Sequence, residues 1–158
     1  MVRVRPDAAQ VWGWLEEVAD PEIPAVSVVD LGIVRDVHWN DDELVVTITP
    51  TYSGCPAMEV IARDIREALL ARGVEKIRLE TKISPPWTTD WISEGGRRRL
   101  HESGIAPPPS ALVQIENVAC PRCGSRATEM ISRFGSTPCK SIYKCRACLE
   151  PFDVFKRH

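Results

Sequence analysis

Four cysteines near the C-terminal end of the chain have the spacing of ligands to a single metal ion. They form two Cys-x-x-Cys pairs, Cys120 with Cys123 and Cys145 with Cys148. Two residues between the cysteines let one tight turn direct both sulfurs at the same ion, and two such turns complete a closed tetrahedral shell. The pattern therefore predicts that residues 111–158 form a zinc ribbon with one structural ion.

The start of the chain favours metal binding over disulfide bonding. It begins Met-Val-Arg-Val-Arg, and no apolar run precedes the first charged helix. We therefore expect a cytoplasmic protein with neither a secretory signal nor a transmembrane span, in which thiols stay reduced. Zinc is the default ion for four such thiolates, although a rubredoxin-like iron site would use the same ligands and is the open alternative.

Another cysteine of this region, Cys139, lies six residues before Cys145. That separation is short enough for Cys139 to compete as a metal ligand. Because the two Cys-x-x-Cys turns already satisfy a tetrahedral ion, we expect Cys139 to be packed rather than coordinated.

A second candidate site surrounds Cys55, which lies in the run Thr51-Tyr-Ser-Gly-Cys-Pro between a predicted strand and a predicted helix. Backbone N–H groups and the helix dipole at such a junction favour a thiolate. The preceding long loop contains the acidic residues Asp20, Glu22 and Asp30. We predict a reactive thiol or transient iron site formed by Cys55, these three carboxylates and Thr51. The alternative is that Cys55 is only a small buried hydrophobe.

Hydrophobic periodicity predicts the α+β scaffold that positions this second site. A helix over residues 7–18 is followed by a loop, and β-branched residues then predict two strands joined by a turn at Asn40-Asp-Asp, which form a hairpin. A second helix begins at Pro56 and ends at Gly73, and a third strand follows. The predicted order is helix, strand, strand, helix, strand, with the strands at residues 33–39, 43–49 and 74–83.

The stretch after the third strand contains two tryptophans, Trp87 and Trp91. We expect a short helix, capped by Thr89 or Asp90 and closed by Gly104, that packs the tryptophans back over the sheet. Exposed tryptophans beside the arginines at 97–99 would instead form a partner-binding patch. The proline-rich run 106–110 is a stiff spacer, so we predict domains at residues 1–105 and 111–158 with a linker at 106–110.

The formal net charge of −2 hides a separation of sign along the chain. Residues 1–109 contain 12 basic and 18 acidic residues, whereas residues 110–158 contain 8 basic and 4 acidic residues. A basic ribbon can contact nucleic acid or an acidic protein partner. The acidic N-terminal part argues against a dedicated nucleic-acid-binding protein.

Several enzyme classes are excluded by what the sequence lacks. The three histidines are His38, His101 and His158, and none belongs to the Glu-x-x-His pair of a di-iron oxygenase. Gly95-Gly96 lies among charged residues and does not form a dinucleotide-binding turn, and the spacing of a plant-type cluster is also absent. We therefore expect neither a di-iron oxygenase nor a flavin- or nicotinamide-dependent reductase, and no stably bound plant-type cluster.

Three motifs of the N-terminal part are Asp20-Pro-Glu-Ile-Pro, Asp30-Leu-Gly-Ile-Val and Thr51-x-x-x-Cys55-Pro. Over about residues 8–83 they resemble the iron–sulfur assembly domain family, which includes SufT-like proteins and the eukaryotic cytosolic iron–sulfur targeting factor. The resemblance implies a metal-centre maturation factor rather than a hydroxylating catalyst, with no catalytic residues and no turnover of its own.

Three further segments extend the resemblance to nearly the whole chain. They are Trp87-Thr-Thr-Asp-Trp-Ile-Ser, Gly104-Ile-Ala-Pro-Pro and Phe134-Gly-Ser-Thr-Pro-Cys139-Lys. Together with the ribbon they resemble the PaaD family, the accessory components encoded with the phenylacetyl-CoA epoxidase complex of phenylacetate catabolism. The resemblance implies help in maturing a multicomponent monooxygenase whose oxygenase carries a di-iron centre and whose reductase carries an iron–sulfur cluster.

Three hypotheses of function follow. In the favoured one, the protein handles iron or an iron–sulfur cluster transiently through Cys55, and its partners are the oxygenase and reductase subunits and other iron–sulfur assembly proteins. In the second, it is a non-catalytic structural adaptor of the monooxygenase complex. The third, a nucleic-acid-binding zinc ribbon, has only the basic residues in its favour. No membrane partner is expected, and a homodimer that brings two Cys55 thiolates together is left open.

Overall fold

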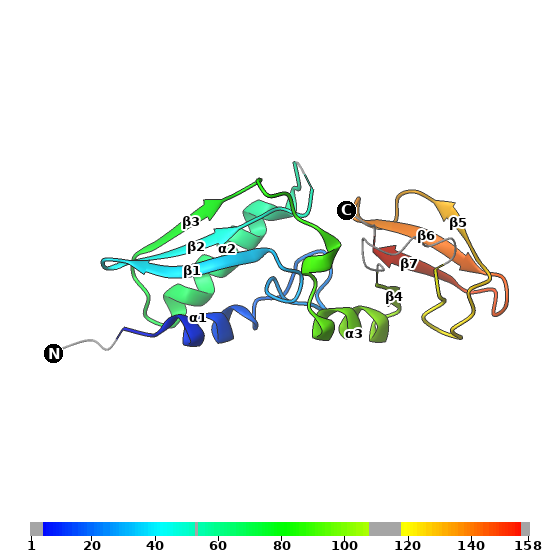
Figure 1. Cartoon of the computed structure of the whole chain (residues 1–158), viewed down its shortest axis with the longest axis horizontal. Coiled ribbons are helices and arrows are strands. Elements are labelled where there is room, and N and C mark those ends of the chain that lie inside the picture. The colour runs from blue at the N-terminus through cyan, green and yellow to red at the C-terminus, as the bar shows by residue number, and fades with distance from the viewer. Residues whose placement is uncertain (1–4, 53, 108–117, 156–158) are drawn as a thin grey trace. The chain divides into compact units, whose positions relative to one another are not determined.

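The computed structural model describes residues 5–52, 54–107 and 118–155, and the chain divides into two compact units, Met1–Trp87 and Thr88–His158 (Figure 1). No described helix combines the length and the apolar character that crossing a membrane requires. Each unit has its own sheet.

The first unit contains the predicted succession of helix, strand, strand, helix and strand, which confirms the α+β fold class. Its helix α1 begins after Asp7, whose side chain accepts the N–H of Gln10 while the Gln10 side chain accepts the N–H of Asp7, a reciprocal cap. Helix α2 ends before Gly73, which takes the positive φ of 88° that terminates helices. The elements are α1 (Ala8–Leu15), β1 (Val34–Asn40), β2 (Glu43–Ile48), α2 (Ala57–Ala71) and β3 (Ile77–Thr81).

The sheet of this unit has the order β1-β2-β3, with an antiparallel β1–β2 hairpin and a parallel β2–β3 pair. Helix α1 contacts β1 and α2, and α2 contacts β3. Leu15 of α1, Leu44 of β2, and Ile65 and Leu69 of α2 are fully buried in this unit. The apolar stripe of α2 is therefore the surface that holds the helix in the unit.

Both loops that carry the predicted iron ligands lie at the same end of this sheet. Strand β1 begins where β2 ends, and the N–H of Thr49 donates to the carbonyl of Ile33 over 2.8 Å. The loop of residues 20–33 therefore meets the start of the segment that leads to Cys55. Strand β3 ends there too, since the N–H of Lys82 donates to the carbonyl of Ile48.

The second unit is a four-stranded sheet preceded by two short helices. They are the 3₁₀-helix η1 (Thr89–Trp91) and helix α3 (Glu94–Glu102). The strands β4 (Ile105–Ala106), β5 (Thr128–Ser132), β6 (Lys140–Cys145) and β7 (Pro151–Phe155) have the order β4-β7-β6-β5. β4 is parallel to β7, and the other two pairs are antiparallel.

The structure differs from the expected domain limits. Along the chain, the boundary between the two units lies between Trp87 and Thr88, whereas the expected boundary lay in the proline-rich run. The reason is that α3 contacts β4, and that β4 pairs Ile105 and Ala106 with Asp153 and Val154 of β7. Residues 88–106 thus belong to the second unit, while residues 108–110 of the expected linker lie outside the described residues.

The two tryptophans do not share one helix. Trp87 is buried in the first unit, where its indole N–H donates to the carbonyl of Leu31 over 2.8 Å, so its expected packing role holds. Trp91 is half-buried in η1. The expected cap at Thr89 or Asp90 is wrong, because Ser93 caps α3 by accepting the N–H of Gly96.

Candidate metal centre and Cys55 loop

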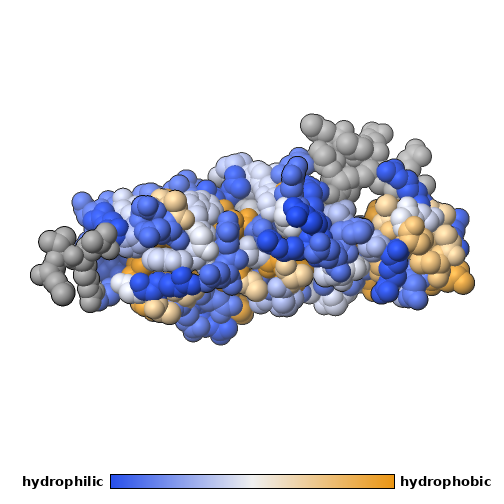
Figure 2. Space-filling model, turned by 90° about the horizontal axis from the view of Figure 1, so that it is seen from below, coloured by the Kyte–Doolittle hydropathy of each residue, from blue (hydrophilic) through white to orange (hydrophobic). Residues whose placement is uncertain are grey.

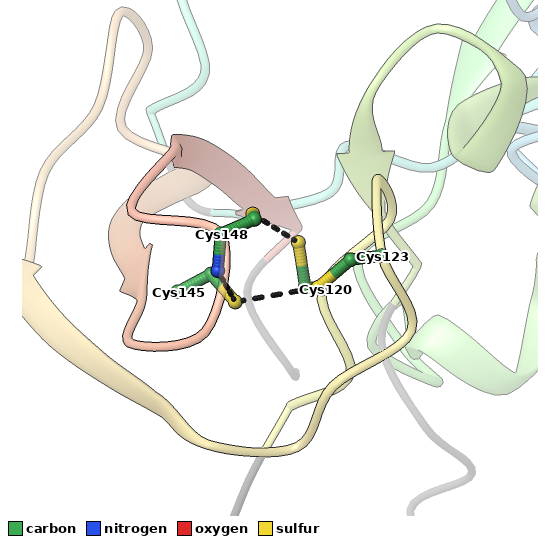
Figure 3. Close-up of side chains that lie close together, drawn as sticks. All are labelled: Cys120, Cys123, Cys145 and Cys148. Carbon is green, nitrogen blue, oxygen red and sulfur yellow. Dashed lines mark hydrogen bonds between the residues drawn. The ribbon is translucent and has the colours of Figure 1, made fainter.

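The four cysteines of the two Cys-x-x-Cys pairs form one cluster (Figure 3). All four sulfurs lie within 4.8 Å of one another. The Cys120 and Cys148 sulfurs are 3.8 Å apart, and the Cys123 and Cys145 sulfurs are 3.5 Å apart. Sulfurs bound tetrahedrally to zinc at about 2.3 Å are separated by about 3.8 Å. The cluster therefore fits a four-thiolate metal ion.

Two turns of the same design present these sulfurs. In the first, Gly124 has a φ of 78° and donates its N–H to the carbonyl of Cys120 over 2.9 Å. In the second, Leu149 has a φ of 66° and donates to the carbonyl of Cys145 over 3.0 Å. Glycine adopts this backbone at no cost, whereas a residue with a Cβ loses about 1–2 kcal/mol. Leu149 is nevertheless 66% exposed, so packing does not offset that cost.

The pKa values of two cysteines in this cluster are shifted in opposite directions. The N–H of Arg122 donates to the Cys120 sulfur, and that of Cys148 donates to the Cys145 sulfur, each over 3.4 Å. Chiefly because of the Cys148 N–H, the pKa of Cys145 falls to about 6. The N–H of Glu150 acts to lower the pKa of Cys148, but burial and the neighbouring thiols raise it to about 12. Four thiolates at this spacing repel one another, so full deprotonation requires a cation.

Two of the four clustered cysteines also belong to the core of the ribbon. Cys120 and Cys145 are buried in a cluster with Ala106, Phe152 and Val154. The other two cysteines, Cys123 of the first turn and Cys148 of the second, are exposed. Two of the five buried members of this cluster are thus candidate metal ligands, and the remaining apolar core is small.

Cys139 lies outside the four-sulfur cluster, in agreement with its predicted packing role. It is 4% exposed, and its sulfur is 2.9 Å from the hydroxyl of Thr137.

Cys55 lies at the junction of a strand-end loop and a helix, as its sequence context predicted. Its N–H donates to the carbonyl of Tyr52, and its carbonyl accepts the N–H of Met58 in the first turn of α2. Pro56 is the N-cap residue of that helix. The helix itself begins at Ala57, one residue later than predicted. The Cys55 residue is half-buried, so a reagent can reach the thiol from solvent.

The acidic residues of the facing loop have different roles. Asp20 is buried, and one of its oxygens accepts the N–H groups of Glu22 and Ile23, each over 2.8 Å. Asp30 accepts the N–H of Ser27 and donates its own N–H to the Ser27 hydroxyl. Both aspartates therefore shape the loop.

The predicted iron ligands do not form a ready coordination shell. Glu22, Asp30, Thr51 and Cys55 are half-buried. In the described part of the chain, the ribbon cluster is the only group of three or more acidic, histidine or cysteine side chains close enough to share one ion. Cys55 and the acidic loop lie at one end of a sheet without converging on a common point.

Some exposed apolar residues of the ribbon were not anticipated. Met130, Ile131 and Phe134 are each more than half exposed. The pattern that could have revealed them is the adjacent pair Met130-Ile131, because successive strand residues point to opposite faces and only one of them can face a core.

Alkylation kinetics should separate the two cysteines that lie outside the cluster. We expect a mild alkylating reagent to modify Cys55 before Cys139 in the native protein, because Cys55 is half-buried and Cys139 is 4% exposed. Time-resolved mass spectrometry of proteolytic fragments measures both rates in one sample, and denatured protein is the control for intrinsic reactivity. Equal or slower modification of Cys55 would contradict the prediction.

Family models match both parts of the chain. Residues 8–78 match the iron–sulfur cluster assembly protein family, and residues 105–156 match the PaaD zinc beta ribbon domain. The second match starts at Ile105, the first residue of β4, and therefore includes the four strands of the ribbon sheet.

Solved structures resemble the chain over little more than half of its length. A domain of unknown function from Bacillus anthracis is 32% identical with a TM-score of 0.55, and covers 58% of this chain and 89% of its own. A conserved hypothetical protein from Thermotoga maritima is 30% identical with a TM-score of 0.53, and covers 63% of this chain and 98% of its own. Both likenesses support the α+β fold.

Among curated relatives, auxiliary factors for iron–sulfur protein maturation match about half of this chain. YitW of Bacillus subtilis is 38% identical over 85 residues, which is 52% of this chain and 82% of the relative. A Porphyromonas gingivalis factor is 39% identical over 82 residues, or 51% and 77%.

A longer match comes from Escherichia coli K12. A protein named provisionally as one of the subunits of 1,2-phenylacetyl-CoA epoxidase is 44% identical over 154 residues, which is 96% of this chain and 93% of the relative. The two family models account for the two sequence regions. The chain therefore belongs to the PaaD family, with a domain of the iron–sulfur cluster assembly type followed by the family's zinc ribbon.

Proposed function

We propose that this protein is an accessory maturation factor, without turnover of its own, for a multicomponent phenylacetyl-CoA monooxygenase. In this role it assists the assembly of iron or an iron–sulfur centre in the oxygenase or reductase subunits. Two sets of names support the proposal. The relative that spans the chain is named for a component of the epoxidase, and the relatives of the first unit are named for iron–sulfur protein maturation.

The observation that carries the proposal is the contrast between two kinds of cysteine. Four cysteines are gathered into one closed cluster, whereas Cys55 is half-buried at a strand-to-helix junction and belongs to no such cluster among the described residues. A closed shell holds its metal permanently, while a thiolate with few partners leaves positions for the ligands of a client. Cys55 is therefore suited to hold iron only in passing.

Within the acidic loop, we take Glu22 as the accompanying carboxylate. Asp20 shapes the loop through two backbone N–H groups and Asp30 through Ser27, and Glu22 also has an interaction of its own within the chain. Glu22 follows in the same turn and is half-buried. Carboxylate oxygen beside thiolate is a donor set that ferrous iron accepts. Asp20 and Asp30 then act by holding the acidic loop in shape.

In the ribbon we propose one zinc ion with a structural role. Cys120, Cys123, Cys145 and Cys148 would hold it through four thiolates. Such a shell leaves no position for water or substrate, so the ion supplies folding energy rather than Lewis-acid chemistry.

A structural adaptor is the second candidate, and the exposed apolar side chains of the ribbon favour it. The two candidates differ in what happens to the client. An adaptor is needed for subunits to associate, whereas a maturation factor is needed for them to receive their metal.

Client iron content distinguishes these functions. The monooxygenase subunits should be produced with and without this chain, purified, and analysed for iron, subunit composition and activity. We expect the subunits made alone to lack most of their iron, and later addition of this protein without iron to leave them inactive. Subunits that carry full iron but do not associate would establish the adaptor instead.

A further inference from the structure

Among the strands that the structure describes, β5 leaves one backbone edge of the ribbon sheet open. It is the outermost strand in the order β4-β7-β6-β5, and the described strand with which it pairs is β6. The carbonyl of Ala127 accepts the N–H of Arg146 over 2.7 Å, which fixes the phase of the antiparallel ladder. Alternate residues then turn their peptide groups away from β6, and Met130 is one of them. Its N–H, which precedes the break in register, therefore points toward the open edge.

Large apolar side chains are exposed on β5 and just after it. Met130 is 51% exposed, Ile131 56% and Phe134 65%. Ile131 lies at a break in register, since Met130 pairs with Tyr143 and Ser132 with Ile142. Figure 2 shows apolar surface gathered on the second unit, at the right of the view. Several large apolar side chains exposed within one short segment are typical of interaction sites in folded proteins.

Phe134 is held in its exposed position rather than left free to collapse. The Ser132 hydroxyl donates to the carbonyl of Phe134 over 2.8 Å and accepts the Phe134 N–H over 3.2 Å. The next residue, Gly135, donates its N–H to the carbonyl of Lys140 over 2.8 Å. An aromatic side chain on an immobilised backbone loses little entropy when a partner covers it.

The charges around the edge are positive. Arg126 precedes β5, and Arg133 follows it. The acidic residue within the strand, Glu129, is paired with Arg146 over 2.7 Å, and this contact lowers the pKa of Glu129. The opposite residue on β6 is Lys144. A partner that approaches this edge therefore meets an excess of cations over carboxylates.

We propose that β5 binds an extended segment of a partner protein, rich in acidic and apolar residues, as an added strand. Main-chain hydrogen bonds to the edge would supply affinity, and pockets for alternate side chains would supply selectivity. Two copies of this chain would place one positive edge against another, which disfavours self-pairing. The acidic N-terminal part of the chain argues against nucleic acid as the partner. The proposal goes beyond the function above, because the surface serves such a partner whether or not iron is transferred.

Selection from a random library of short displayed peptides tests this proposal on the full-length protein. We expect the enriched peptides to be rich in Glu, Asp and large apolar residues and poor in proline. In NMR spectra they should shift the amides of β5 and protect that of Met130 from exchange. Combining Ile131→Ser with Phe134→Ser should weaken their binding about tenfold or more. Arg133→Glu should weaken it as well, with a larger effect at low salt.

Ile83→Ser is the matched control, because Ile83 is 73% exposed in the first unit. It should leave peptide affinity unchanged, and all variants should keep the circular dichroism spectrum and metal content of the parent. Failure to enrich any peptide would overturn the proposal, as would peptides that are basic or proline-rich. Binding that survives the double substitution would also overturn it. Self-association or DNA binding that the double substitution abolishes would assign the edge to those partners instead.

Discussion

Replacing Cys120 with serine should release the metal ion and unfold the ribbon strands while the first unit stays folded. Structural zinc contributes about 10–16 kcal/mol of apparent binding free energy in small zinc-dependent domains. The buried ribbon cluster is small and includes Cys120 and Cys145 themselves. Loss of one ligand therefore removes both the ion and part of the core that would have to replace it.

Metal analysis and NMR measure the two consequences separately. We expect the parent protein to contain one metal ion per chain and Cys120→Ser almost none, with loss of dispersed amide signals from β4 and residues 118–155 and none from the first unit. Cys139→Ala is the matched control, since Cys139 lies outside the cluster and its replacement should leave the metal in place. A single transition that unfolds both units together, or a variant that keeps its metal, would show that the ribbon does not depend on the ion in this way.

Replacing Cys55 with alanine should abolish the benefit that this protein gives to its client. Because the residue is half-buried in a loop, we expect the stability of the chain to change by less than about 1 kcal/mol. The ribbon metal should be unaffected. The oxygenase or reductase produced beside the variant should contain as little iron as it does with no accessory protein, since the ligand that passes iron on is gone.

Two acidic-loop variants refine this result. Glu22→Gln should give a weaker iron defect with a normal fold. Asp20→Ala should instead lower the melting temperature, because the buried N–H groups of Glu22 and Ile23 lose their acceptor. The readouts are client iron by mass spectrometry and thermal unfolding of this chain. Full client iron and activity beside Cys55→Ala would favour the adaptor function.

Local patterns in the sequence were sufficient to predict most of the first unit. The stripe containing Ile61, Ile65 and Leu69 has the period of a helix, and Gly73 ends it. The hairpin follows from β-branched residues around a polar turn. These features depend on near neighbours in the chain, so spacing alone identifies them.

The features that spacing could not predict depend on distant residues. Strand β4 consists of two residues and exists because Ile105 and Ala106 pair with a strand far along the chain. The cysteine cluster was predictable because each turn is local, whereas the distance between Cys55 and the acidic loop depends on the tertiary fold. The structural use of Asp20 was likewise hidden, because the same carboxylate can bind a metal or cap a backbone turn.

Strand β4 also determines where this chain can be cut and recombined. A ribbon excised at the proline-rich run would leave behind Ala106, which belongs to the buried cluster, and would strip β7 of a neighbour. The exposed edge of β7 would then be open to pairing with other chains. A ribbon that is to be transferred to another protein must therefore start before α3, near Thr88. A gene fusion or domain exchange that joins at the prolines would transfer an incomplete sheet.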